Sequence, residues 1–153
     1  MSLNELKRTV QELILPILEA KRAFLVDVQV RGEQGVKIIQ AFVDTDSGIT
    51  IAECADISRE LNKVLGLSQI IEGAYNLEVS SPGIDKPLKL LRQYFKNIGR
   101  TYKVRYGKDS EEFSLIGTLT DVTDDCLTFS PEQGEPLTLM FSQIIESKEE
   151  LPW

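Results

Sequence analysis

Residues 77–88, LEVSSPGIDKPL, separate two parts of the chain that have different sequence patterns. The segment begins like a strand, because the apolar residues Leu77 and Val79 alternate with polar ones. Pro82 and Gly83 suit the centre of a type II turn, since proline presets φ and glycine tolerates a positive φ. The residue before each proline is pushed toward extended backbone. The sequence therefore predicts a rigid, kinked exit from a sheet.

The chain before this segment starts with one helical pattern and two strand patterns. Apolar residues recur every three or four positions over 3–22, which predicts an amphipathic helix. Pro16 lies inside that pattern and predicts a kink or break, because proline removes a backbone donor. Strands are predicted over 24–30 and 36–43, joined by a loop with two glycines.

A second helix is predicted to begin at Thr50. Thr50 and Glu53 have the spacing of a capping box, and Gly66 suits the C-terminal cap of this helix. Alternation over 75–80 predicts a further strand. The order helix, strand, strand, helix, strand predicts an α+β domain with two helices on one face of a small sheet.

The chain after the segment has the pattern of short strands. Gly117 lies inside one of them, where glycine indicates a bulge or a sharp bend. Five strands within about fifty residues predict a small closed barrel. We place the domains at 1–91 and 92–153. The predicted strands cover 102–106, 113–122, 126–129, 137–141 and 145–147.

Charge is distributed unevenly along the chain. The formal net charge of −7 argues against non-specific binding to nucleic acid. Between positions 86 and 108, however, there are eight basic residues and no acidic one, flanked by acidic stretches on both sides. Such a local cluster is typical of surfaces that attract phosphate groups or acidic proteins. This basic band consists of Lys86, Lys89, Arg92, Lys96, Arg100, Lys103, Arg105 and Lys108.

Catalytic and metal-binding interpretations have weak support. The chain has no histidine, the usual general base and commonest metal ligand. A hydrolase built on Ser81 and Lys86 stays an alternative, although Ser81 lacks the context of a nucleophile elbow. The acidic residues Asp44, Asp46 and Glu53 fit a solvated turn leading into a helix better than a metal site. We therefore expect no catalytic residue, no metal and no cofactor.

The two cysteines and the absence of targeting patterns bear on location. Neither Cys54 nor Cys126 belongs to a CxxC pair, and both fit free thiols in a reducing compartment. No apolar run approaches the ~20 residues of a membrane span, and the N-terminus lacks a secretory pattern. We expect a cytoplasmic protein that does not associate with a membrane.

The kinked exit and the basic band together form the candidate partner-binding site. In this hypothesis the exit orients hydroxyl, carboxylate and ammonium groups, and the band contacts RNA. A strand-ending turn and solvated lysines are the alternative interpretation. The candidate residues are Ser80, Ser81, Gly83, Asp85, Lys86, Lys89, Arg92, Lys96, Arg100, Lys103 and Arg105.

A family resemblance extends this hypothesis. The stretch 73–88, GAYNLEVSSPGIDKPL, closely resembles the signature of the ribosome maturation factor RimP family. The stretches 25–28 and 48–61 are also similar to that family. Its members commonly carry leucine and arginine where this chain has Ile84 and Lys86. Lysine keeps the charge but loses the bidentate geometry of arginine.

The resemblance implies a fold and a role. It implies an N-terminal α-β-β-α-β-β domain followed by a small five-stranded Sm-like (SH3-like) β-barrel. It implies a non-enzymatic factor for assembly of the small (30S) ribosomal subunit. We expect a monomer, because the sequence offers no obvious means of ring assembly. The implied partners are the free 30S subunit and small-subunit ribosomal protein twelve, and the basic band adds 16S rRNA as our own hypothesis. A general RNA-binding module based on the Sm-like barrel stays an alternative from a different class.

Overall fold

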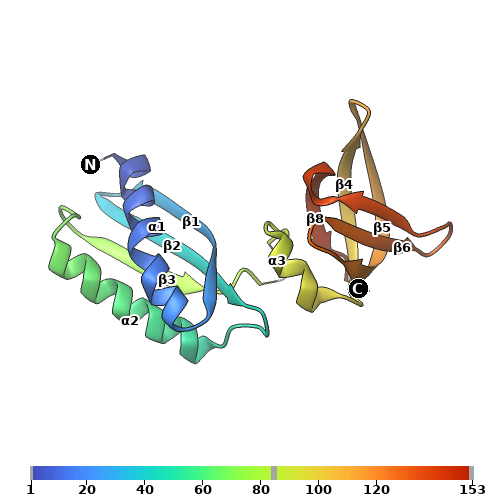
Figure 1. Ribbon diagram of the computed structural model, residues 1–153. Coiled ribbons are helices and arrows are strands. Elements are labelled where there is room, and N and C mark those ends of the chain that lie inside the picture. The colour runs from blue at the N-terminus through green and yellow to red at the C-terminus, as the bar shows by residue number, and fades with distance from the viewer. Residues whose placement is uncertain (1, 84–85, 152–153) are drawn as a thin grey trace. The chain divides into compact units, whose positions relative to one another are not determined.

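The computed structural model describes residues 2–83 and 86–151. The chain is α+β, with helices and two separate sheets of three and five strands (Figure 1). It divides into two compact units, Met1–Pro82 and Gly83–Trp153. The domain ranges 1–91 and 92–153 stay a prediction. No helix of the described residues is long and apolar enough to cross a membrane.

The first unit begins with helix α1 (Leu3–Ala20). The Ser2 hydroxyl caps it by accepting from the Glu5 N–H at 3.1 Å. The helix continues past Pro16, so the predicted break does not occur. Pro16 lies on the exposed face, where water can satisfy the carbonyl of Glu12 that proline leaves without a donor. The buried face of α1 consists of Leu6, Val10, Ile14 and Leu18.

Three strands form the sheet of the first unit, in the order β1-β2-β3. Strands β1 (Ala23–Glu33) and β2 (Val36–Thr45) form an antiparallel hairpin. Its turn residues Gln34 and Gly35 have φ of 51° and 80°, as a two-residue type I′ turn requires. The hairpin is therefore tighter than the predicted loop. Strand β3 (Tyr75–Ser80) pairs parallel to β2 and matches the predicted strand.

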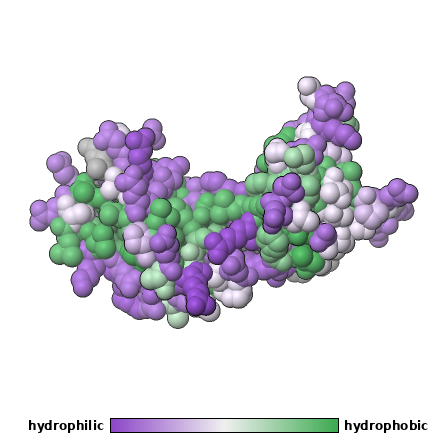
Figure 2. Space-filling model, viewed as in Figure 1, coloured by the Kyte–Doolittle hydropathy of each residue, from purple (hydrophilic) through white to green (hydrophobic). Residues whose placement is uncertain are grey.

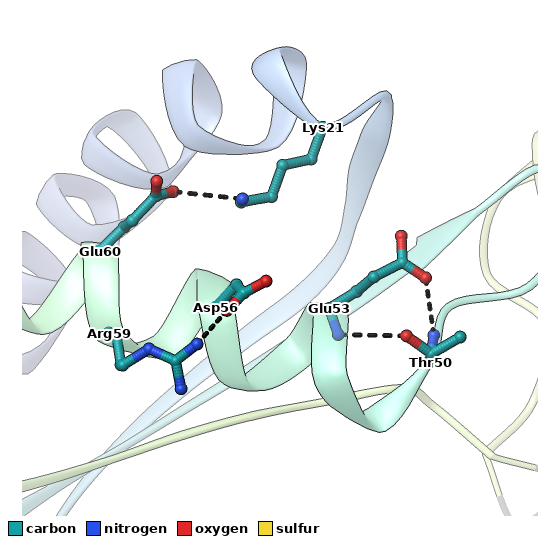
Figure 3. A network of polar contacts seen from close by, with 6 residues as sticks. All are labelled: Lys21, Thr50, Glu53, Asp56, Arg59 and Glu60. Atoms are coloured by element: carbon teal, nitrogen blue, oxygen red, sulfur yellow. Dashed lines mark hydrogen bonds and ion pairs between the residues drawn. The ribbon is translucent and has the colours of Figure 1, made fainter.

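Helix α2 (Ile51–Ser68) begins at the predicted capping box (Figure 3). The Glu53 N–H donates to the Thr50 hydroxyl, and the Thr50 N–H donates to the Glu53 carboxylate, both at 3.1 Å. The predicted end at Gly66 is wrong, since the helix continues to Ser68 and Gln69 adopts the left-handed cap with φ of 52°. Buried side chains from both helices, β1 and β2 form one hydrophobic core.

One strand, not the two that the resemblance implies, follows α2 in the described part of the first unit. Pro82 lacks the N–H that a longer ladder would need, and Gly83 turns the chain with φ of 67°. Further on, Leu88 forms an isolated bridge to Ser147 within the second unit. The α-β-β-α-β-β order is therefore corrected to α-β-β-α-β.

The second unit has two short helical segments before a five-stranded sheet. Its helical segments are α3 (Leu91–Tyr94), η1 (Phe95–Asn97) and, between the last two strands, η2 (Phe141–Gln143). Its strands are β4 (Thr101–Lys108), β5 (Glu111–Val122), β6 (Cys126–Pro131), β7 (Leu137–Met140) and β8 (Ile144–Glu149). All neighbouring strands pair antiparallel, in the order β7-β6-β5-β4-β8. The five predicted strands are thus present.

The predicted closure of the barrel is wrong. Strands β7 and β8 lie at opposite edges of the sheet, and no ladder joins them within residues 86–151. All four residues of β7 pair with β6, and η2 then carries the chain to the far side of β4. The sheet therefore encloses its core without a continuous ring of strand pairs.

Gly117 allows two strands to approach closely. A Cβ atom at this position would lie 3.2 Å from the backbone of Ser130. The irregularity in the β5–β6 ladder falls later, between Leu119 and Asp121. The predicted bulge does not occur at Gly117 itself, and the glycine instead permits the close approach of β5 and β6.

Candidate partner-binding surfaces

Ser80 and Ser81 line a groove in the first unit. The groove has a volume of about 420 Å³ and lies between the beginning of α2 and strand β3. Its wall on the α2 side includes Ile51 and Cys54. On the other side, five consecutive residues from Leu77 to Ser81 contribute to it. Because successive side chains of a strand point to opposite faces, a groove lined by five in a row follows the edge of the strand.

The groove has a negative electrostatic environment. Glu78 is the charged residue among those that line it, and no lysine or arginine of the described chain does so. Burial raises the pKa of the Cys54 thiol above its usual value, and the negative charges of Glu53 and Asp44 raise it further. Glu53 of α2 and Asp44 of β2 therefore both act on Cys54 in the wall of the groove.

Two ion pairs involve residues of α2 outside the groove. Glu60 pairs with Lys21 at 3.8 Å, and Asp56 pairs with Arg59 one turn away (Figure 3). All four side chains are partly or largely exposed, so these pairs contribute little to stability. None of these four residues lines the groove.

The structure gives no support to the catalytic and metal alternatives. The chain has no histidine that could activate the Ser81 hydroxyl as a nucleophile. The Glu53 carboxylate belongs to the capping box. No group of three or more metal-binding side chains occurs among the residues described.

The remaining candidates of the kinked exit lie at its far end. Gly83 has the positive φ that the type II turn predicts. Asp85 lies outside the described residues. Lys86 is half-buried and begins the basic band, all of which belongs to the second unit.

Hydrogen bonds hold the first half of the basic band in place beside the sheet of the second unit. The buried Gln93 side chain accepts from the N–H groups of Lys89 at 2.7 Å and Leu90 at 2.8 Å. The Tyr94 hydroxyl donates to the Ser147 hydroxyl at 2.7 Å in the core. These bonds hold the chain on either side of Arg92 in one conformation, and Lys89 and Arg92 themselves are exposed. Lys96 follows on η1 and is half-buried.

The second half of the band is compensated by acidic neighbours. Arg100 pairs with Glu149 at 3.0 Å, and this hydrogen bond and charge raise the pKa of the arginine. Arg105 lies between Glu112 at 3.2 Å and Glu146 at 3.8 Å. Strand β4 is central in its sheet, and its neighbours β5 and β8 bring these carboxylates beside it. Acidic residues of β5 and β8 thus lie beside the second half of the basic band.

Lys148 was missed by the sequence analysis. It is the single basic residue after Lys108, and the ladder places it directly opposite Lys103. The two lysines share one surface with Arg105 and the carboxylates around it. Its acidic surroundings in the sequence conceal it, and only the register of β4 and β8 would have indicated its position.

Hydrophobic side chains also reach the surface. On the face shown in Figure 2, patches of hydrophobic residues lie among the hydrophilic ones. Ile51 at the groove is 90% exposed, and Leu67 near the other end of the same helix is 76% exposed. Single exposed apolar residues are common on protein surfaces, and Ile51 differs from Leu67 in that it lines the groove.

One comparison with known proteins bears on these surfaces. A family model described as RimP N-terminal domain matches residues 13–85. The matched range covers most of the first unit, including α2, β3, Ser80, Ser81 and Gly83.

Proposed function

Because this chain belongs to the RimP family through the domain at residues 13–85, we propose that it is a maturation factor for the small (30S) ribosomal subunit. It acts by binding, without catalysis. Its partners are the free 30S subunit, small-subunit ribosomal protein twelve and 16S rRNA. It works as a monomer in the cytoplasm. The family match is the observation that carries this proposal.

The distribution of charge supports a division of labour between the two units. Residues 1–82 contain 12 acidic and 8 basic residues, and none of the described residues that line the groove at β3 is basic. Ribosomal proteins are basic, so the first unit suits the protein partner. Lys89 and Arg92 are exposed, and hydrogen bonds hold their backbone in place. Their charges can therefore contact phosphate groups of rRNA.

A general RNA-binding module with an Sm-like second unit is the alternative. The strand order, in which the last strand β8 pairs beside the first strand β4, supports a likeness to such modules. Sm-like proteins usually bind RNA as rings. A hexamer or heptamer in a light-scattering measurement of mass would favour this alternative, and a monomer would favour the maturation factor.

Co-sedimentation with purified free small subunits and with complete ribosomes tests the proposal. We expect the protein to sediment with free subunits and not with complete ribosomes. Reversing Lys89, Arg92 and Lys96 together to glutamate should weaken binding at least tenfold at low salt, because contacts to phosphate release counterions. Reversing the exposed Arg8, Arg22 and Lys63 of the first unit changes the net charge equally and serves as the control.

Two results would contradict parts of the proposal. If the wild-type protein failed to bind free subunits, the assembly role would be wrong. If the band variant bound as well as the control at low and high salt, the role in rRNA contact would be wrong while the assembly role would stand.

A further inference from the structure

Strand β3 has an unpaired edge. It pairs with β2 on one side, and no other strand pairs with it within residues 2–83 and 86–151 (Figure 1). Natural proteins usually protect such an edge with lysine, proline or a bulge, because its backbone groups can pair with another chain. The register of β2 and β3 is regular over all six residues, and none of them is lysine or proline.

The outward-facing backbone groups of this edge can be identified. The Ala74 carbonyl accepts from the Lys37 N–H of β2 at 3.1 Å, so the backbone groups of Ala74 face β2. The N–H and C=O of one residue point to the same side of a strand, and the side alternates along the chain. The N–H and C=O groups of Tyr75, Leu77 and Val79 therefore face away from β2.

The groove follows this same edge. It provides the space that the side chains of an added strand need, next to the backbone groups that would pair with it. Its wall is largely apolar, and Ile51 stands beside it 90% exposed. Strand addition combines these two elements, with main-chain hydrogen bonds for affinity and pockets for alternate side chains.

We propose that the outer edge of β3 binds an extended, basic segment of a protein partner as an added strand, with side chains of that segment in the groove between β3 and α2. The inference rests on the proposed function and names the surface and binding mode for its protein partner. A peptide fits because the edge offers alternating main-chain donors and acceptors. A basic segment fits because Glu78, Glu53 and Asp44 act on the groove, and no lysine or arginine among the described residues lines it.

The charge also argues against two other occupants. RNA would bring phosphate groups against these carboxylates, which is unfavourable. A second copy of this chain would bring a second acidic edge with its own Glu78. A basic protein segment meets neither penalty.

The substitutions Val79→Pro and Val79→Ala test the main-chain part of the proposal. Both remove the packing of the valine, but only proline removes an outward N–H, and it leaves the bonds to β2 in place. Binding of purified ribosomal protein twelve to the full-length chain is measured by fluorescence anisotropy. We expect Val79→Pro to weaken binding at least tenfold relative to Val79→Ala, with melting temperatures that confirm both variants are folded.

The substitutions Ile51→Lys and Leu67→Lys test the groove. Both replace an exposed apolar residue of α2 by a cation, but only position 51 lines the groove. Neither change touches the buried core, so both variants should fold. We expect Ile51→Lys to weaken binding of the ribosomal protein about tenfold and Leu67→Lys to leave it within about twofold, since like charges repel a basic segment.

The outcomes separate this inference from the proposed function. If wild-type protein binds ribosomal protein twelve and Val79→Pro binds as well as Val79→Ala, the edge is not the site, although the proposed function stands. If the wild-type chain binds neither that protein nor the free subunit, both fail. If Val79→Pro instead loses binding to an rRNA fragment, or abolishes a dimer seen by light scattering, the edge has a different occupant and the proposal is wrong.

Discussion

Strands β3 and β4 both carry candidate residues, but they differ in which backbone groups they leave available for a partner. Strand β3 is an edge strand with an unpaired row of backbone groups and an adjoining groove. Strand β4 is central, paired on both sides, and presents only side chains. Its arginine Arg105 already contacts carboxylates from both neighbouring strands. Strand β3 is therefore suited to bind a peptide backbone. Strand β4 can contact a partner only through its side chains.

The difference shows that a run of like charge in a sequence does not define a surface. Arg100 and Arg105 lie within the basic band, yet each is matched by glutamates from the acidic stretch that follows it. Lys89 and Arg92 lie before the sheet begins, and they are exposed. The proposed contact with rRNA includes these two exposed residues.

The largest effect should come from proline in the central strand. Val104→Pro removes a ladder hydrogen bond as well as packing in the core, and should destabilise the second unit by about 3 kcal/mol or more. Val79→Pro in the edge strand should destabilise the first unit little more than Val79→Ala. Urea unfolding followed by separate methyl NMR signals of the two units measures both. Equal costs in the two strands would contradict the assignment of β3 as an edge.

A somewhat smaller effect is expected at the close approach of β5 and β6. Gly117→Val places side-chain atoms against the backbone of Ser130 and should cost about 2 kcal/mol in the second unit alone. Gly107→Val is the control, because the nearest atom to its Cβ is 3.8 Å away. The same urea experiment applies. A loss of stability in the first unit would show that the two units do not unfold independently.

The buried hydrogen bond between Tyr94 and Ser147 should make the next largest contribution to stability. Tyr94→Phe leaves the Ser147 hydroxyl without this donor and should cost about 1–2 kcal/mol near neutral pH. Burial raises the pKa of Tyr94 above its usual 10.0, although the hydrogen bond to Ser147 lowers it. The folded state therefore keeps the proton at a pH where the unfolded state releases it.

This pKa shift gives the effect a pH dependence. The stability that depends on the Tyr94 proton is present below pH 10 and is lost as the pH rises above it. The difference in unfolding free energy between wild type and Tyr94→Phe should therefore shrink from pH 8 to pH 11. A difference that stayed constant or grew would mean that the hydroxyl is not retained as a buried, protonated donor.

The smallest effect on stability concerns the carboxylates beside β4. Replacing Glu112 and Glu146 together by glutamine removes the partners of Arg105 and should change stability by less than about 1 kcal/mol, because the pairs are exposed. Affinity for a 16S rRNA fragment at low salt should rise several-fold. The variant Asp121→Asn with Glu132→Gln removes the same charge elsewhere on the second unit as a control. Equal gains in both variants would indicate net charge rather than Arg105.

The sequence predicted elements whose signals are local. The capping box of Thr50 and Glu53, the strand at 75–80 and the glycine of the turn at Gly83 follow from interactions between residues close in the chain. The end of α2 was placed at Gly66 because glycine is a frequent cap, but the helix continued to Ser68. Local signals thus identified elements better than their ends.

Features that depend on pairing between distant segments were not predictable. The openness of the second sheet depends on which edge β8 joins, and the pairs of Arg100 and Arg105 with Glu149 and Glu146 depend on the register of strands about forty residues apart. The groove required the placement of α2 against β3. Of the candidate site, the sequence indicated Ser80 and Ser81 but not the edge and groove beside them.

Hydrogen exchange of the β3 amides, with and without bound free small subunit, tests the central claim most directly. In the free protein, the amides of Leu77 and Val79 should exchange quickly, and those of Asn76 and Glu78, which face β2, should exchange slowly. Binding of the subunit should slow exchange at Leu77 and Val79. Unchanged exchange at these two amides, in a sample where the protein is bound to the subunit, would contradict strand addition at β3.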